Sequence, residues 1–207
     1  MRIVGCVGAL LCAVAAVSAQ GSIVWSPERK LTKGDFQGRV PAQAVNSSMS
    51  WLHIDASWEC VVGELTASAQ ATFDPSRSWW RTTYGNVWGN AGERTTAERA
   101  QARARRNVMM FDAQLLEHEQ LHFDLTELAA RKIRKRFEED FKDACLDPGG
   151  TEPIQAMVAD ADRELQEEQA RYDRETNHGV NLRVQDKWAR RIRSQLKDAP
   201  PVDQLGR

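Results

Sequence analysis

The sequence has few cysteines, few histidines and, beyond its first nineteen residues, no long apolar run. Four cysteines occur in 207 residues, and two of them lie within that first stretch. The two that remain, Cys60 and Cys145, have no second Cys or His at metal-ligand spacing, which argues against a cysteine-based zinc site. Without an apolar run of about 20 residues after position 19, the chain also has no candidate for a membrane-spanning helix.

The sequence also lacks an excess of charge of either sign. It contains 28 Lys and Arg against 29 Asp and Glu, and 27 against 29 once Arg2 is left out. Such a balance gives no reason to expect nucleic acid or an anionic membrane as a partner. A cluster of arginines between residues 99 and 106 has no interleaved aromatic residues, so it indicates a solvated helix face rather than a nucleic-acid site.

The first nineteen residues have the pattern of an export signal. Arg2 gives a basic start, residues 3–17 are apolar, and Val17-Ser18-Ala19 is a small-residue cleavage site. We therefore expect an exported protein, periplasmic or secreted, with one domain over residues 20–199 and a tail over 200–207. In an exported chain, Cys60 and Cys145 most simply form one disulfide, which would close a loop of roughly 85 residues. The alternative is two free, buried thiols.

Hydrophobic periodicity predicts an α+β fold. An irregular lead-in over 20–48 is followed by alternating residues at 49–58 and 65–73, which indicate an antiparallel hairpin that turns near Gly63. A Gly- and Asn-rich loop comes next, and the rest of the chain is helical. The expected helical segments are 95–106, 112–144, 151–177 and 184–196.

The longest of these segments carries His118-Glu119-Gln120-Leu121-His122, the HExxH pattern of zinc hydrolases. Two histidines four apart lie about 40° apart around a helix, one turn along, so both rings can reach one ion. Glu119 lies on the same side, where it can take a proton from zinc-bound water. Apolar residues surround most of this half of the helix, and the remaining arc is a polar solvent stripe of Glu117, Gln120, Asp124 and Glu127. We therefore expect buried histidines rather than an accidental match on a surface helix.

A catalytic zinc usually has three protein ligands and one open position. His178 is the attractive third ligand, because it follows a helix end where a short turn can aim its ring inward. The alternative is a polar loop histidine beside Gly179. Tyr172 could donate a hydrogen bond to a developing oxyanion, or be an ordinary core tyrosine, and Asp173 could orient a ligand ring as a second-shell partner.

Four runs of the chain resemble a bacterial family of secreted zinc-dependent proteases, a HExxH domain of unknown function. The resemblance runs from about residue 25 to 196, and its most specific pieces are HEQLHFD and the Tyr-Asp…Thr-x-His-Gly run. It implies a zincin-like α+β unit in which the second motif faces the first, which favours His178 as third ligand. The four runs are Leu31–Gly38, Ser78-Trp79, His118–Glu127 and Tyr172–Gly179.

Together these features predict an exported zinc metallopeptidase in which His118, His122 and His178 hold Zn²⁺ and Glu119 is the general base. The expected partner is a peptide or protein substrate, and a cell-wall peptide or another amide is the second enzymatic interpretation. The alternative from another class is a non-catalytic exported binding module with a structural or vestigial metal. A segment over 81–110, which is additional to the resembling runs, would then cover or line the cleft.

Overall fold

The computed structural model describes residues 21–44, 47–81, 94–146 and 150–198, and the side chains of 94–109 lie outside that description. The expected leader, the loop over 84–92 and the tail over 200–207 therefore lie outside the described residues. Export and a single domain over 20–199 stay predictions.

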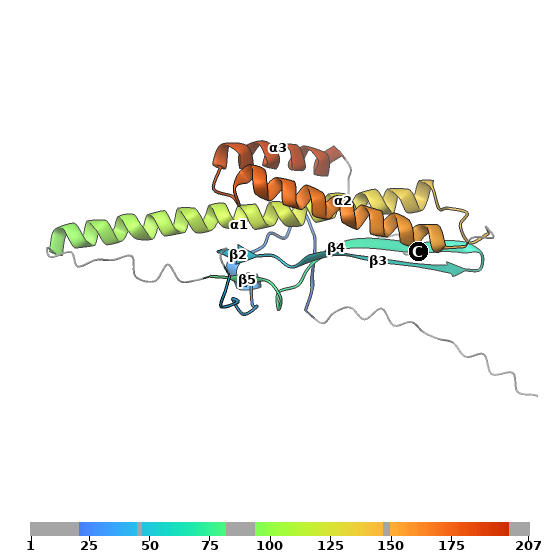
Figure 1. Cartoon of the computed structure of the whole chain (residues 1–207), viewed down its shortest axis with the longest axis horizontal. Coiled ribbons are helices and arrows are strands. Elements are labelled where there is room, and N and C mark those ends of the chain that lie inside the picture. The colour runs from blue at the N-terminus through green and yellow to red at the C-terminus, as the bar shows by residue number, and fades with distance from the viewer. Residues whose placement is uncertain (1–20, 45–46, 82–93, 147–149, 199–207) are drawn as a thin grey trace, which may run out of the picture.

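The fold is α+β, with two small antiparallel sheets on one side of three helices (Figure 1). One sheet has three strands in the order β1-β4-β3, and the other pairs β2 with β5. The strands are β1 (Ile23–Val24), β2 (Ser48–Met49), β3 (Leu52–Val61), β4 (Glu64–Phe73) and β5 (Trp79–Trp80), and the helices are α1 (Arg94–Glu139), α2 (Glu152–Thr176) and α3 (Leu182–Asp198). A zincin-like fold in the narrower sense stays a prediction.

The predicted hairpin is present as β3 and β4, which pair along their whole length. Val62 and Gly63 form its turn with positive φ angles of 53° and 84°, as expected of a tight hairpin turn. The strand begins at Leu52 rather than at residue 49. The reason is that Met49 belongs to β2, which pairs with Trp79 of β5 in a separate sheet.

The α1 helix lies at the centre of the core. Its apolar residues pack against the hairpin and lead-in on one side and against α2 and α3 on the other. The two helical segments expected at 95–106 and 112–144 are one continuous helix of 46 residues. It ends at Glu139, and the following residues form turns that contain Cys145.

The expected solvent-facing arc of α1, Glu117, Gln120, Asp124 and Glu127, is only partly exposed. Glu117 faces outward, but the expectation is wrong for Gln120, Asp124 and Glu127. All three are less than 9% exposed. Trp25 Nε1 donates a hydrogen bond to Asp124 Oδ1 at 2.8 Å, and Gln120 Oε1 accepts one from the Leu31 amide at 2.8 Å. These polar residues are buried because each has a specific partner.

Glu127 is also paired inside the protein. Its carboxylate accepts hydrogen bonds from Arg131 Nε at 2.9 Å and from Arg134 Nη2 at 2.7 Å. The buried acidic side chain is therefore charge-compensated within α1, which is the condition for keeping such a group out of water.

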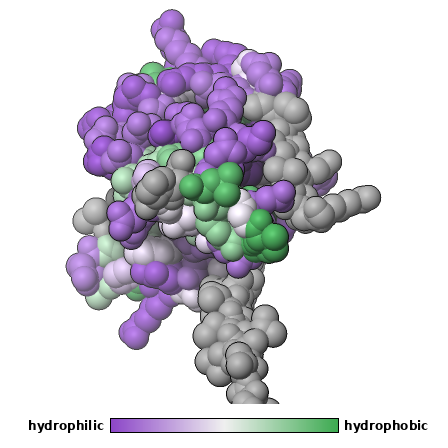
Figure 2. Space-filling model, turned by 90° about the vertical axis from the view of Figure 1, so that its right-hand side faces the viewer, coloured by the Kyte–Doolittle hydropathy of each residue, from purple (hydrophilic) through white to green (hydrophobic). Residues whose placement is uncertain are grey.

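Cys60 and Cys145 form a disulfide-compatible pair with their sulfur atoms 2.10 Å apart. The pair joins β3 near the hairpin turn to the turns after α1. The same end of the molecule exposes a small apolar group within a mostly hydrophilic surface (Figure 2). The exposed apolar side chains in these segments are Val61, Val62 and Leu146. Within the described residues, no helix is long and apolar enough to cross a membrane.

Candidate metal centre

The α1 helix presents His118, Glu119 and His122 toward the interior. His118 and Glu119 are 2% and 4% exposed, and the His122 side chain is 12% exposed. The two imidazole rings lie edge to face with their centroids 4.6 Å apart, as the four-residue spacing predicts. The HExxH motif therefore lies inside the protein and not on an exposed helix surface.

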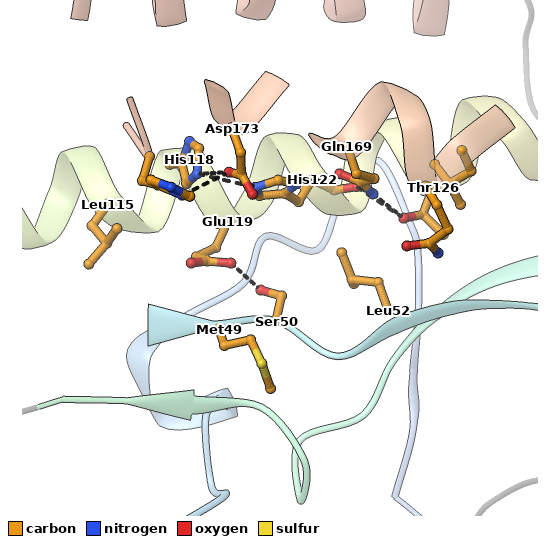
Figure 3. A pocket seen from close by; sticks show the side chains of 13 residues that line it. Met49, Ser50, Leu52, Leu115, His118, Glu119, His122, Thr126, Gln169 and Asp173 are labelled. Carbon is orange, nitrogen blue, oxygen red and sulfur yellow. Dashed lines mark hydrogen bonds and ion pairs between the residues drawn. The ribbon is translucent and has the colours of Figure 1, made fainter. Parts of the chain in front are cut away.

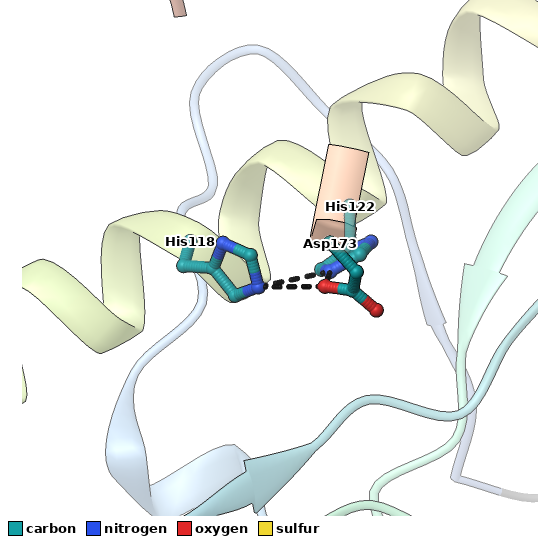
Figure 4. A group of neighbouring side chains, drawn as sticks. All are labelled: His118, His122 and Asp173. Atoms are coloured by element: carbon teal, nitrogen blue, oxygen red, sulfur yellow. Dashed lines mark hydrogen bonds and ion pairs between the residues drawn. The ribbon is translucent and has the colours of Figure 1, made fainter. Parts of the chain in front are cut away.

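The α2 helix adds a carboxylate to the two rings. Asp173 Oδ1 lies 3.0 Å from His118 Nε2 and 3.0 Å from His122 Nε2, and the two Nε2 atoms are 3.1 Å apart (Figure 4). His118, His122 and Asp173 are the group of metal-ligating side chains that comes together in the described part of the chain. Asp173, expected from the sequence to orient a ligand ring, directs its carboxylate oxygen toward Nε2 of both rings.

The spacing of these three atoms fits a small divalent cation. An ion about 2.0–2.1 Å from each donor, with tetrahedral angles, holds its donors about 3.3–3.4 Å apart. The observed separations of 3.0–3.1 Å are within a few tenths of an ångström of that value. Two imidazole nitrogens and one carboxylate oxygen are also a donor set that zinc accepts.

Gln169 fixes the His122 ring in the orientation that metal binding needs. Its Nε2 donates to the His122 carbonyl oxygen at 3.0 Å and to Thr126 Oγ1 at 3.2 Å, which identifies its Oε1 as the atom facing His122 Nδ1. Because Oε1 only accepts, Nδ1 must carry the proton, and Nε2 of the neutral ring keeps its lone pair. That lone pair points at a carboxylate oxygen and a second ring nitrogen, a cluster that requires a cation or a proton.

Tyr172 holds the other ring. Its hydroxyl lies 2.9 Å from His118 Nδ1, and its ring stacks on the imidazole at a centroid distance of 4.7 Å. The side chain is fully buried. Hydrogen bonds to the outer nitrogen of a ligand histidine commonly set its orientation. The role of Tyr172 as an oxyanion donor stays a prediction. In the structure its hydroxyl contacts Nδ1 of His118, the ring nitrogen that points away from Asp173.

The charges around the site shift three pKa values. Burial alone would raise the pKa of the Asp173 carboxyl, but hydrogen bonds from His118 and His122, made when Nε2 of these rings is protonated in the metal-free site, outweigh burial and hold that pKa well below its ordinary range. Burial alone would lower the pKa of His122, yet its contact with Asp173 and the charge of Glu119 raise it. Burial, together with the charges of Glu119 and Asp173, raises the pKa of Tyr172, so its hydroxyl keeps its proton.

A pocket of about 210 Å³ opens onto the two rings, Glu119 and Asp173 (Figure 3). The Glu119 carboxylate projects from α1 toward the β2 side of this pocket, where Ser48 Oγ and Ser50 Oγ each donate to one of its oxygens at 2.6 Å. Thus two carboxylates, of Glu119 and Asp173, and two imidazoles share one solvent-connected space.

His178 lies at the rim of the same pocket. It is 59% exposed at the side chain, and its Nδ1 is 3.4 Å from Asp173 Oδ1. Its backbone, like that of Asn177, is left-handed, with φ near 50°, because both residues form the turn that ends α2. The structure thus brings the second motif to the first, as the resemblance implies, while His178 as a metal ligand stays a prediction.

Gly179 is the point where this turn touches His118. Its φ is +82°, and a Cβ at this position would lie 3.1 Å from both Cβ and Cγ of His118. We expect Gly179→Ala to destabilise the protein by about 1–2 kcal/mol through the backbone alone. We also expect it to weaken metal binding by roughly 10-fold, because the ring must shift. Thermal unfolding and a zinc titration measure the two effects.

Gly150→Ala is the matched control for this prediction. Gly150 also has a positive φ, +55°, but a Cβ there would meet nothing within 4 Å. The Gly150→Ala variant should therefore lose stability through its backbone to an extent similar to Gly179→Ala, and it should keep the wild-type metal affinity. Equal metal affinities in the two variants would show that Gly179 does not position His118.

Sequence reasoning missed three residues that contact the site. Gln169 is one turn before Asp173 on α2, so both side chains lie on the same face of the helix. Once Asp173 is known to face α1, Gln169 is expected to face α1 too. Ser50 belongs to the same alternating set as Leu52, and this pattern already put it on the inner face. Ser48 carries no such signal, because the strand that holds it has only two residues.

The fold and site define a class: an α+β protein with a partly buried His–His–Asp candidate metal centre and an adjacent carboxylate. Residues 92–179 match the sequence profile of a family described as "Bacterial protein of unknown function (DUF922)". The matched region runs through α1 and α2 to Gly179 and contains all the candidate ligands. No curated protein and no solved structure was found to match the chain.

Proposed function

We propose that this protein is an exported, zinc-dependent hydrolase that cleaves a peptide amide, with His118, His122 and Asp173 as the metal ligands. The observation that carries the proposal is the convergence of two Nε2 atoms and one carboxylate oxygen within 3.0–3.1 Å of one another. A bound zinc ion supplies Lewis acidity, which activates water and polarises a carbonyl group.

The side chains around the donors do the rest of the chemistry. Glu119 takes the proton of the attacking water and returns it to the leaving amine, as a general base and then a general acid. Tyr172 contacts Nδ1 of His118 and Gln169 contacts Nδ1 of His122, and these hydrogen bonds hold the two rings on the side opposite the metal position. Because both rings are anchored, the donors are preorganised, and little rearrangement is needed when the ion binds.

The lining of the pocket supports a neutral substrate segment. Within the described residues, no Lys or Arg lines it, and the charged groups present are the site's own. The apolar lining residues are Met49, Leu52, Leu115 and Leu165. A peptide with apolar or small uncharged residues beside the scissile bond fits such walls, whereas an acidic residue would face Glu119 and Asp173. The disulfide-compatible cysteine pair supports export.

The decisive experiment measures metal and hydrolysis on the same purified chain. We expect about one zinc per chain by mass spectrometry, and cleavage of members of a fluorescent peptide library that a chelator abolishes and added zinc restores. The His118→Ala/His122→Ala variant should lose both the metal and the cleavage. Absence of bound divalent metal from the wild-type protein would refute the proposal.

The alternative function is an exported binding module with a structural metal. The observation that favours it is the Nδ1 of His178, 3.4 Å from Asp173 Oδ1, because a small side-chain movement would close a four-ligand site. Such a protein would bind one zinc tightly and cleave no peptide in the library. It would also lose the metal when His178 is replaced, which a three-ligand catalytic site would not.

A further inference from the structure

The carboxylate of Glu119 is held by two hydroxyl groups at once. Ser48 Oγ lies 2.6 Å from Glu119 Oε1, and Ser50 Oγ lies 2.6 Å from Glu119 Oε2. A carboxylate can only accept, so both hydroxyls donate, in short charge-assisted bonds. Ser48 and Glu119 are 6% and 4% exposed, so water competes little for the Ser48 contact, while the Ser50 contact is partly buried.

The two serines are themselves fixed by distant parts of the chain. They are two apart in an extended segment, so they project from the same face toward α1. Ser48 lies opposite Trp80 in the β2–β5 pair, and the Trp51 amide donates to Ser78 Oγ at 2.8 Å. The segment on either side of Ser50 is thus anchored to the residues that follow the hairpin.

Two donors on different oxygens fix a carboxylate more completely than one does. A single hydrogen bond leaves the carboxylate plane free to rotate about that contact, whereas a second bond to the other oxygen prevents the rotation. Each Glu119 oxygen still has a lone pair for a proton. A base that must take a proton from water in a defined position benefits from this restriction, because small misplacements of a catalytic group cost large factors in rate.

We propose that Ser48 and Ser50 are positioning residues that orient the Glu119 carboxylate for proton transfer. The role rests on the proposed function, since it assumes that Glu119 is the base. It assigns β2 and the residue that follows it a role in orienting the base, in addition to lining the pocket. The two serines act through Glu119 and contact none of the candidate metal ligands by a hydrogen bond that the structure records.

The kinetic test is the Ser48→Ala/Ser50→Ala variant assayed on the best cleaved library peptide. We expect kcat to fall roughly 10- to 100-fold, while KM and zinc content stay within about twofold. The kcat of each single variant should lie between those of the double variant and the wild type. Ser50→Thr, which keeps a hydroxyl, should restore most of kcat. A kcat within twofold of the wild type in the double variant would overturn the proposal.

Ser57→Ala is the matched control. Ser57 Oγ makes a hydrogen bond of 2.9 Å to Ser68 Oγ on the exposed side of the hairpin. The Ser57→Ala variant therefore loses a serine hydroxyl and its hydrogen bond in β3, the next strand along the chain, away from Glu119. Its kcat should be unchanged.

A second measurement does not depend on hydrolysis. In the metal-free protein, the double serine variant should lower Tm by roughly 5–10 °C, because a buried carboxylate loses two donors. In a Glu119→Ala background the same change should lower Tm by only a degree or two. Equal shifts in both backgrounds would show no coupling and overturn the proposal. Coupling with unchanged kcat would overturn it too, because the contact would then be structural only. If the wild type cleaves nothing, the proposed function fails and the positioning role fails with it, even if the coupling is observed.

Discussion

Replacing Asp173 with alanine is expected to cost the protein its metal. The variant loses the carboxylate oxygen that lies 3.0 Å from both Nε2 atoms, leaving two imidazoles to hold the ion. Loss of an orienting partner alone costs about 10- to 100-fold in metal affinity, so loss of a direct ligand should cost at least about 100-fold. A competition titration with a chromophoric zinc chelator measures this change.

Two controls make that result specific. Asp162→Ala removes an exposed carboxylate from the same helix and should leave zinc affinity unchanged. His178→Ala should reduce affinity by no more than about threefold, because the ring lies at the rim and is largely exposed. The reverse order, with His178 essential and Asp173 dispensable, would restore the ligand set that the sequence suggests. Equal large losses would indicate a closed four-ligand site.

The local parts of this site were predictable, and the reason is that helix geometry is regular. Four-residue spacing fixes how His118 and His122 lie relative to each other, whatever packs around them. The hairpin and the three helices also follow from periodicity that extends over ten or more residues. The disulfide-compatible pair needed only a count of the cysteines that remain after the expected leader.

The choice between Asp173 and His178 was not predictable in the same way. Both residues lie near the end of α2, and which one meets the rings depends on how α2 crosses α1. The left-handed turn at Asn177 and His178 ends the helix and leaves the His178 ring at the rim. The last turn of α2 still points its carboxylate inward. No periodic pattern in one helix determines its register against another.

The buried polar residues of α1 are a second feature that periodicity within one helix could not predict. Gln120 and Asp124 have the spacing of a solvent stripe, and their partners come from residues about 90 and 100 positions earlier. Two-residue strands such as β2 and β5 have no period at all. These non-local contacts bring Ser48 and Ser50 to the site, and hydrophobic pattern alone does not encode them.

Glu119→Gln is expected to abolish hydrolysis while the metal stays in place. The substitution keeps the shape of the side chain and a carbonyl oxygen for one serine hydroxyl, but the amide cannot take a proton from water. General base catalysis contributes about 10²- to 10⁴-fold, so we expect kcat to fall by about 10³-fold. Zinc content should remain about one per chain, because Glu119 is not among the three converging donors. Single-turnover assays and mass spectrometry on one preparation measure both quantities.

Glu117→Gln is the matched control, with the same chemical change two residues away on the same helix. The Glu117 side chain is 42% exposed and pairs with Arg193 at 2.7 Å on the outer surface. It should keep full activity, which also excludes a co-purifying protease as the source of the difference, since both variants share one purification. A Glu119→Gln enzyme that retains more than a tenth of the wild-type kcat would remove Glu119 as the base. The serine contacts would then serve only to satisfy a buried charge, as hydrogen bonds to buried carboxylates do elsewhere in proteins.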